Sequence, residues 1–243
     1  MLPQFSLCIA TMKRWSFLKE NLPKYLANPY LSEIILVDET GEDFQKIKQV
    51  YGSNPKIHVF QNETRLGPFL NKLECMKRAK NDWIALIDSD NYADEAYFET
   101  LLRVFDATKL KRVYMPSKAL PNFDYSAYAG MLLTPSTIGE LLRTKQDLHL
   151  TTCFNTGNYV LSKQALETLS VFSKDELSKQ SFCCDVIYAN TILLQDGFEF
   201  CVVPNLEYSH IAHEGSVYFE YIGRSRHISE YVHAMFENLM RKA

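Results

Sequence analysis

Two carboxylates separated by one serine follow an apolar run in the first half of the chain. The segment WIALIDSDNYADEAYF, residues 83–98, places Asp88 and Asp90 directly after the apolar residues. At about 4 Å and an effective dielectric constant of about 20, two such charges repel by roughly 4 kcal/mol. Either a bound cation relieves this repulsion or the two side chains point apart. The first alternative indicates a divalent cation, Mn²⁺ or Mg²⁺, that holds substrate phosphates.

The same acids also have a structural interpretation. Aspartate is a favoured residue at helix N-caps, and Asp90 and Asp94 both precede the helical pattern EAYFETLLRVF. Short acidic pairs are common by chance. The pair by itself therefore leaves a metal site and a helix cap open.

The elements around these acids follow a regular order. The β-rich runs FSLCIA, EIILVD, KIHVF and WIALID alternate with helical patterns that begin near Ser16, Asp43 and Gly67. This alternation predicts parallel βαβ units in a sheet that helices cover on both faces. Ligands of such sheets bind beyond the carboxyl ends of the strands, so we expect Asp38, which ends the second run, at the same edge as the acidic pair.

The second half of the chain is less regular. We expect strands at RVYMPS, at the start of NTGNYVLSKQAL and at FEFCVVP. We expect helices that begin near Pro135, that span CCDVIYANTILLQDG up to Gly197, and that cover residues 224–243. No repeat, low-complexity stretch or linker interrupts the chain, so we predict a single domain over residues 1–243.

Composition excludes several classes of protein. The 243 residues are 47% hydrophobic, and 26 basic residues against 29 acidic ones give a net charge of -3. No global field attracts nucleic acid or an anionic membrane. The six cysteines form no CxxC pair, which indicates buried free thiols and a cytoplasmic protein. No apolar run approaches the roughly 20 residues that span a bilayer, so we expect membrane contact to be peripheral at most.

About the first hundred residues resemble the nucleotide-sugar domain of GT-A fold glycosyltransferases, particularly glycosyltransferase family 2. The resemblance rests on four motifs in the family's order and spacing, within SLCIATMKRWSFLKENLPKYL, SEIILVDET and VFQNETRLGPFLNKLECMKRAKNDWIALIDSDNYAD. It implies an α/β GT-A fold with a mostly parallel central sheet. A Rossmann-like nucleotide-binding half at residues 1–95 would merge with an acceptor-binding half at residues 96–243, which includes the C-terminal helix.

The resemblance implies roles for single residues on the nucleotide side. In the family, a threonine that ends the first strand lies beside the base, and an aspartate after the second strand contacts it. Thr11 and Asp38 occupy these positions. The first acid of the DxD motif, here Asp88, usually meets the ribose, and the last acid, here Asp90, meets the metal.

The helix after the motif's Asn and Leu-Gly residues carries side chains that face the nucleotide in the family. Asn71 and Lys72 lie in that stretch, which makes them candidate donor-binding residues. Lys72 would neutralise phosphate charge; the alternative is a solvated lysine on an amphipathic helix. The chain departs from the family in having ATMKR where PTYNR is common, and Asn71 near a frequent arginine.

The resemblance continues into the second half. CFNTGNYVLSKQAL is similar to the family's segment under the acceptor, which implies that Gly157 and Asn158 lie near the reacting sugar. FCCDVIYANTILLQDGFEFCVVP is similar to the family's Glu-Asp helix and implies that Asp185 is the catalytic base, with Cys184 where an acid is common. The alternative for Asp185 is an ordinary first-turn acid at the positive end of a helix dipole.

Two histidines follow the last predicted strand in EYSHIAHEGS. A histidine here binds the metal in a number of GT-A enzymes, and neutral imidazole is a good metal ligand. His213, beside a polar Glu-Gly-Ser loop, is the first candidate and His210 the second; a structural role is the alternative for each. Four further residues are expected either to line the site or, for the tyrosines, to belong to the core: Tyr218, Tyr221, Arg224 and Arg226.

These features together predict a Mn²⁺- or Mg²⁺-dependent glycosyltransferase. It would move a sugar from a UDP- or GDP-sugar to a hydroxyl of a carbohydrate or glycoconjugate acceptor, by direct displacement with inversion. A nucleotidyltransferase is the alternative enzyme, but ATMKRWSF lacks the glycine-rich loop usual in that class after the first strand. A non-catalytic domain that binds sugar nucleotides is the second alternative, because an acid is missing at Cys184.

Overall fold

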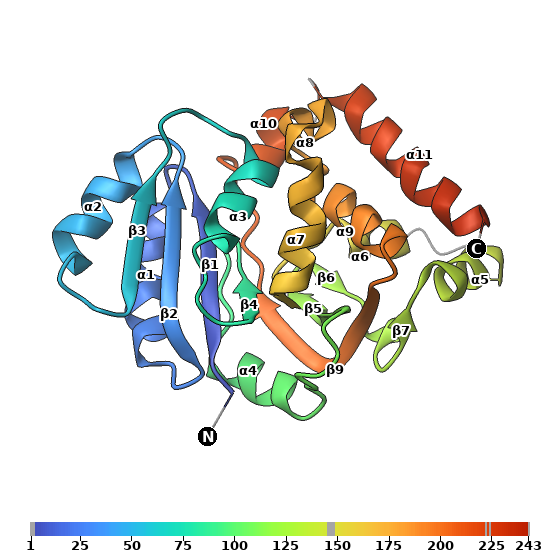
Figure 1. Cartoon of the computed structure of the whole chain (residues 1–243), viewed down its shortest axis with the longest axis horizontal. Coiled ribbons are helices and arrows are strands. Elements are labelled where there is room, and N and C mark those ends of the chain that lie inside the picture. Colours follow the sequence, from blue (N-terminus) through green and yellow to red (C-terminus); the bar gives the residue numbers. More distant parts are fainter. Residues whose placement is uncertain (1–2, 145–148, 222, 224, 243) are drawn as a thin grey trace.

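The computed structural model describes residues 3–144, 149–221, 223 and 225–242 of the chain (Figure 1). Its strands are β1 (Phe5–Thr11), β2 (Leu31–Asp38), β3 (Ile57–Gln61), β4 (Trp83–Leu86), β5 (Arg112–Leu120), β6 (Phe123–Asp124), β7 (Leu132–Leu133), β8 (Tyr159–Ser162) and β9 (Glu199–Ser209). Its α-helices are α1 (Trp15–Ala27), α2 (Glu42–Tyr51), α3 (Pro68–Met76), α4 (Glu95–Leu102), α5 (Pro135–Thr144), α6 (His149–Phe154), α7 (Lys163–Val171), α8 (Glu176–Gln180), α9 (Asp185–Gln195), α10 (Val217–Tyr221) and α11 (Arg226–Lys242). Two 3₁₀ turns are η1 (Ser126–Tyr128) and η2 (Phe172–Lys174).

One mixed sheet runs through the described part of the chain. Its strands lie in the order β3-β2-β1-β4-β8-β5-β9-β7, and β6 pairs with β5 beside this path. The strands β3, β2, β1 and β4 are parallel, which confirms the prediction from the alternating pattern. In the register, Thr11 pairs with Asp38 and Asp38 with Gln61, so these strands end together. Since β8 is antiparallel to β4, its first residue lies at that same carboxyl edge.

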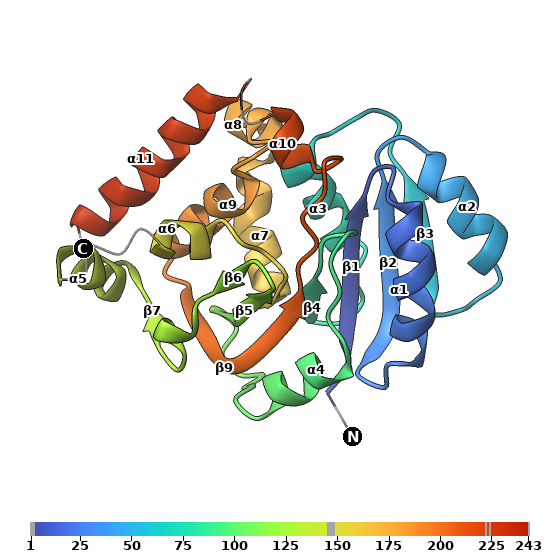
Figure 2. The same cartoon turned by 180° about the vertical axis from the view of Figure 1, so that it is seen from behind.

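Helices cover both faces of the sheet (Figures 1 and 2). Along β1, Phe5, Leu7 and Ile9 belong to one buried apolar cluster and Cys8 belongs to the other. The first cluster includes side chains of α1 and α4, and the second includes side chains of α3, α7, α9 and α11. Both faces of the strand are therefore buried in apolar surroundings, which explains why the sequence of β1 lacks an apolar-polar alternation.

Gly67 and Asp94 mark the starts of two helices that the sequence predicts. Gly67, with φ of 84°, precedes Pro68 at the first position of α3. Only glycine adopts this conformation without steric cost, and proline fits the first turn. Asp94 is the N-cap of α4, and its carboxylate accepts a hydrogen bond of 3.0 Å from the N–H of Tyr97. The cap interpretation is thus confirmed for Asp94.

The second half contains short elements that the sequence pattern did not predict. The strands β6 and β7 have two residues each, and α8 and α10 have five, too few to show a period. β9 extends to Ser209, beyond the predicted FEFCVVP, because it stays paired with β5 across a register shift near Pro116. The expected helices near Pro135 and in the tail are present as α5 and α11.

All six cysteines are buried and lie outside any disulfide bond, which confirms the prediction of thiols. Within the described segments, every helix is too short or too polar to cross a bilayer.

Candidate active site

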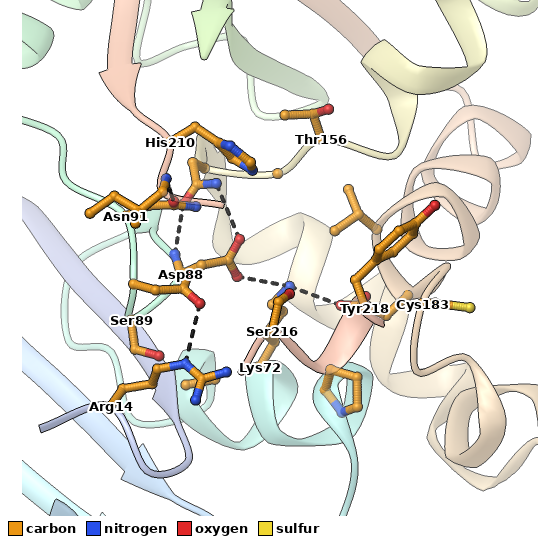
Figure 3. A pocket seen from close by; sticks show the side chains of 18 of the residues that line it. Arg14, Lys72, Asp88, Ser89, Asn91, Thr156, Cys183, His210, Ser216 and Tyr218 are labelled. Atoms are coloured by element: carbon orange, nitrogen blue, oxygen red, sulfur yellow. Dashed lines mark hydrogen bonds and ion pairs between the residues drawn. The ribbon is translucent and has the colours of Figure 1, made fainter. Parts of the chain in front are cut away.

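A cavity of about 560 Å³ lies at the carboxyl edge of the sheet (Figure 3). It is lined by the turns after β1, β2, β4 and β9, by the start of β8 and by residues of α3 and α9. Its volume is in the range of pockets that bind small molecules and cofactors. The predicted site residues that line it are Thr11, Asn71, Lys72, Asp88, Asp90, Gly157, Asn158, Asp185 and His210.

The carboxylates of Asp88 and Asp90 point to different partners. Asp88 lies 3.0 Å from Nζ of Lys72 and accepts a hydrogen bond of 3.2 Å from Nδ2 of Asn158. Asp90 Oδ2 lies 3.2 Å from Nε of Arg14 and 2.9 Å from Nε2 of His213. Each acid therefore has its own cationic neighbour, which offsets the repulsion between the two without a shared ion. Arg14 was not predicted as a site residue from the sequence, although it is the last residue of the motif ATMKR.

Lys72 bridges two acids from opposite halves of the chain. Its Nζ lies 2.8 Å from Oδ2 of Asp185, in addition to the contact with Asp88, which Figure 3 shows beside Lys72. Burial lowers the pKa of Lys72, but the two carboxylates outweigh this effect and hold that pKa well above its usual range. Lys72 is thus a charged, partly buried residue and not a solvated one.

The two acids that Lys72 joins differ in pKa. Burial raises the pKa of Asp88, but Lys72 and Asn158 outweigh it, so the pKa of Asp88 lies below its usual range. Burial also raises the pKa of Asp185, and there Lys72 offsets it only in part, so the pKa of Asp185 lies above its usual range. Asp185 is therefore the more basic of the two carboxylates.

Asn158 positions Asp88 from the start of β8. Besides the contact of its Nδ2, its Oδ1 accepts a hydrogen bond of 2.6 Å from the N–H of Asp88. Asn158 has φ of 69°, a left-handed conformation that asparagine tolerates better than most residues, and its carbonyl accepts a bond of 2.9 Å from the hydroxyl of Tyr97. A Cβ at the preceding Gly157 would lie 3.4 Å from Val186, so glycine leaves this wall of the cavity open.

The turn after β1 is held by Asp43, which sequence reasoning also missed as a site-building residue. Its fully buried carboxylate accepts a hydrogen bond of 2.6 Å from the Thr11 hydroxyl and one of 2.9 Å from the N–H of Arg14. Thr11 therefore lines the cavity with its hydroxyl already engaged.

Asp38 lies at the predicted sheet edge, but its carboxylate does not line the cavity. It is fully buried and accepts hydrogen bonds from the N–H groups of Thr40, at 3.1 Å, and Phe44, at 2.9 Å. These bonds hold the turn into α2. The structure thus gives Asp38 a turn-forming role, and its contact with a base stays a prediction.

Glu39, the next residue, does line the cavity. One carboxylate oxygen, Oε2, lies 3.6 Å from Nε of Arg65 and accepts a bond of 3.3 Å from the N–H of Gly67. The other oxygen, Oε1, is buried without a hydrogen-bond partner. Burial raises the pKa of Glu39. Glu39 thus lines the part of the cavity that follows β2, and its covered Oε1 is an acceptor that no group of the described residues uses.

Asn71 lines the cavity but is engaged on the side of the sheet. Its Nδ2 donates to the carbonyl of Val37 at 3.2 Å, and its Oδ1 accepts a bond of 2.9 Å from Asn62. It joins α3 to the end of β2 and to the loop after β3.

The two histidines differ in their surroundings. His213 lies outside the cavity lining, contacts Asp90 and packs against Phe17 at a centroid distance of 5.0 Å, with the two rings tilted by 41°. His210 lines the cavity; Nδ2 of Asn122 lies 2.7 Å from its Nδ1, and burial lowers its pKa. The preference for His213 over His210 as a metal ligand stays a prediction. Within the described residues, no group of three or more His, Cys, Asp or Glu side chains is arranged as a metal site.

The residues named after the histidines fall into three groups. Tyr218 lines the cavity. Arg226 is exposed and pairs with Glu230 on α11. Arg224 and the side chain of Tyr221 lie outside the described residues.

Comparison with known proteins defines the class. The family Glycosyl transferase family 2 matches residues 6–169, which is more than half of the chain. The chain therefore belongs to this family. A curated relative is the glucosyl-dolichyl phosphate glucuronosyltransferase of Haloferax volcanii, 25% identical over 101 residues, or 41% of this chain. The aligned part is 32% of that relative, so the chain spans about a third of its length.

Solved structures share the fold across almost the whole chain. The mannosyltransferase PcManGT from Pyrobaculum calidifontis, in complex with GDP-Man and Mn²⁺, has a TM-score of 0.67 at 13% identity. The match covers 99% of this chain and 68% of PcManGT. TarS from S. aureus, in complex with UDP-GlcNAc, has a TM-score of 0.64 at 11% identity, with 98% and 71% covered. These neighbours confirm the predicted GT-A fold.

Proposed function

We propose that this protein transfers a sugar from a UDP- or GDP-sugar to a hydroxyl of a carbohydrate or glycoconjugate acceptor, with a divalent metal and with inversion. The observation that carries the proposal is the bridge of Lys72 between Asp88 and Asp185. It joins the acid of the nucleotide half to the expected base of the acceptor half across one cavity. The neighbours in complex with UDP-GlcNAc and with GDP-Man and Mn²⁺ support a nucleotide-sugar donor.

The donor would occupy the part of the cavity next to β1 and β2. The unpartnered Oε1 of Glu39 is an acceptor for an N–H of the base, so we propose Glu39 for the contact first expected of Asp38. Arg14 and Lys72 are positive charges close to the acids of the motif. They would balance the negative diphosphate once it is bound.

Asp90 and His213 would hold the metal. The carboxylate Oδ2 and the imidazole Nε2 lie 2.9 Å apart, so one oxygen and one nitrogen donor already face each other. Both donor types suit Mn²⁺, and the diphosphate and water would complete the set. When bound, the ion would stabilise the charge that develops on the leaving diphosphate.

Asp185 would act as the general base. The acceptor hydroxyl loses its proton to this carboxylate while its oxygen bonds to the anomeric carbon and the bond to the diphosphate oxygen breaks. The raised pKa of Asp185 suits this step, because a stronger base accepts the proton more readily.

The acceptor would bind on the side of Lys72 that faces away from Arg14, where Figure 3 shows Cys183 and Tyr218. Uncharged side chains from the second half of the chain line the cavity, which suits a sugar ring with its hydroxyls and apolar face: Thr152, Thr156, Cys183, Val186, Tyr218 and Phe219. The six buried cysteines, which lie outside any disulfide bond, support a cytoplasmic address. The near balance of charges gives the protein no overall positive field that would attract nucleic acid.

A screen of nucleotide sugars would test the proposal. UDP- and GDP-sugars are compared by thermal stabilisation with Mn²⁺, with Mg²⁺ and with EDTA, and turnover is measured as release of the nucleoside diphosphate. A donor at one hundred times its dissociation constant stabilises the protein by about 2.7 kcal/mol. Stabilisation without turnover would favour a non-catalytic binder. Release of pyrophosphate from nucleoside triphosphates would favour a nucleotidyltransferase. No effect of any nucleotide sugar would refute the proposal.

A further inference from the structure

Arg14 has an unusual set of partners for a residue at the mouth of a nucleotide cavity. Its residue surface is only 8% exposed. Nε donates to Oδ2 of Asp90 at 3.2 Å, and Nη2 donates to the carbonyl of Gly215 at 2.6 Å. The guanidinium thus joins the turn after β1, the acidic motif after β4 and the segment after β9.

In the turn after β1, Nη1 of Arg14 donates to the carbonyls of Met12, at 3.2 Å, and Lys13, at 3.3 Å, and the main chain of Arg14 has a separate anchor. Its N–H donates to both carboxylate oxygens of the buried Asp43, at 3.1 and 2.9 Å. The side chain can therefore change partners while the turn after β1 keeps its shape. The side chain now contacts the carboxylate of Asp90 in the acidic motif and the neutral carbonyl of Gly215 in the segment after β9.

The oxygen that Arg14 contacts is the same oxygen that faces His213. Oδ2 of Asp90 lies 3.2 Å from Nε of Arg14 and 2.9 Å from Nε2 of His213. A metal held between Asp90 and His213 would lie close to a fixed guanidinium, and two cations at such a distance repel strongly. The other acid of the motif gives no relief, because Asp88 already pairs with Lys72.

We propose that Arg14 couples metal binding to donor binding. In the free protein the guanidinium neutralises Asp90 and weakens its affinity for a divalent cation. An incoming diphosphate offers Arg14 a better anionic partner, draws it from Asp90 and leaves that carboxylate to the metal. Metal and nucleotide would then each raise the affinity for the other by the same factor. This inference rests on the proposed function for its donor, but its metal arm can be measured without any nucleotide.

The experiment measures Mn²⁺ binding to the whole protein by calorimetry or by the EPR signal of free Mn²⁺. Wild type and Arg14→Met are compared without nucleotide and then with saturating UDP or GDP. We expect Arg14→Met to bind Mn²⁺ at least tenfold more tightly without nucleotide. For each protein, the Mn²⁺ dissociation constant without nucleotide is divided by the constant with nucleotide. This ratio should be at least tenfold smaller for Arg14→Met than for wild type. Equal or weaker binding of Mn²⁺ by nucleotide-free Arg14→Met would overturn the proposal.

Three further variants separate this effect from others. Arg14→Lys keeps the charge and should stay within about threefold of wild type; Arg14→Gln repeats the loss of charge should Arg14→Met fail to fold. Lys13→Gln removes the neighbouring charge, whose side chain is 60% exposed and paired with Glu42 at 3.5 Å, and should change nothing. An effect of Lys13→Gln as large as that of Arg14→Met would contradict a specific role for Arg14.

The site of the gained affinity is tested by adding Asp90→Asn to Arg14→Met. The gain in Mn²⁺ affinity should disappear; a gain that persists would place the ion elsewhere and overturn the proposal. A wild-type protein that binds neither UDP nor GDP at any Mn²⁺ concentration would contradict the proposed function instead. The nucleotide-free comparison would still decide whether Arg14 suppresses metal binding.

Discussion

Asp88 and Asp90 leave the same strand end, yet they belong to two differently built parts of the cavity. The Lys72 cluster comprises Lys72, Asp88, Asn158 and Asp185, and its residues come from α3, the end of β4, the start of β8 and α9. The Arg14 cluster comprises Arg14, Asp90, His213 and Gly215. Its residues come from the turn after β1, the turn after β4 and the segment between β9 and α10.

The two clusters also differ in charge. Two carboxylates share one ammonium in the Lys72 cluster, whereas one carboxylate meets one guanidinium in the Arg14 cluster. The surplus negative charge therefore lies where a proton has to be accepted. The balanced cluster lies where, in our proposals, a guanidinium and a metal exchange places. Regular elements suit the first task because a base needs fixed geometry, and irregular segments suit the second because partners change.

The largest effect is expected from the base of the Lys72 cluster. Asp185→Asn keeps the size of the side chain but removes its basicity, so turnover should fall by about 10² to 10⁴ while the donor dissociation constant stays nearly unchanged. The measurement is steady-state kinetics with calorimetry of donor binding. Asp196→Asn, in the exposed pair with Lys111 at the other end of α9, is the matched control.

Two results would contradict this assignment. Near-normal turnover of Asp185→Asn would remove Asp185 from the mechanism. A product whose anomeric configuration by NMR equals that of the donor would rule out inversion.

A smaller effect is expected from the histidine of the Arg14 cluster. His213→Ala should raise the Mn²⁺ concentration for half-maximal activity on the order of tenfold, because a contact at the metal is lost. His210→Ala should have a smaller effect, since its Nδ1 faces Asn122. His233→Ala, whose Nδ1 lies 2.7 Å from the carbonyl of Ser229 on α11, is the control. If the metal titration is the same for all three variants, both site histidines are structural.

The pH dependence should report the base of the Lys72 cluster. Burial raises the pKa of Asp185 above its ordinary value of 3.8, and the base must be ionised to act. Turnover should therefore fall as the pH falls through this raised pKa, so the acid limb of the kcat profile lies above pH 3.8. Lys72 favours the ionised form, and Lys72→Met should move the limb to higher pH.

Lys77→Met is the control for Lys72→Met. It tests whether removing any lysine of α3 or its C-cap moves the acid limb. Lys77 pairs with Glu74 at 2.6 Å on the surface, so its removal should leave the limb in place. An acid limb that stays fixed or moves to lower pH in Lys72→Met would separate Lys72 from the ionisation of Asp185.

The smallest effect is expected from the third acid of the same stretch. Asp94 caps α4 through the N–H of Tyr97 and belongs to neither cluster. Asp94→Ala should lower the free energy of unfolding by about 1 kcal/mol and leave the Mn²⁺ dependence of activity unchanged. Denaturant titration and a metal titration measure the two quantities. An altered Mn²⁺ dependence would mean that the acidic motif extends beyond Asp90.

Much of the site could be predicted because it depends on strand ends. A run such as FSLCIA shows its strand directly, and the polar residue that ends a parallel strand must lie at the common edge, as Thr11 does. Residues that only hold the side chains of the site in place show no such pattern in the sequence. Asp43 reads as an ordinary first-turn acid of α2, although its buried carboxylate holds the turn after β1.

The sequence by itself determined the parallel half of the sheet, the helix ends at Gly67 and Gly197, and the family, because these depend on neighbouring residues and on motif order. Only the tertiary structure decided which groups meet. Lys72 reaches Asp185 across 113 positions of the chain, and Arg14 reaches Gly215 across 201. Such contacts depend on how β8 and β9 return to the sheet, and periodicity along the chain carries no information about that return. The charge state of each acid follows from these contacts, so the division of work between Asp88 and Asp90 belongs to the fold.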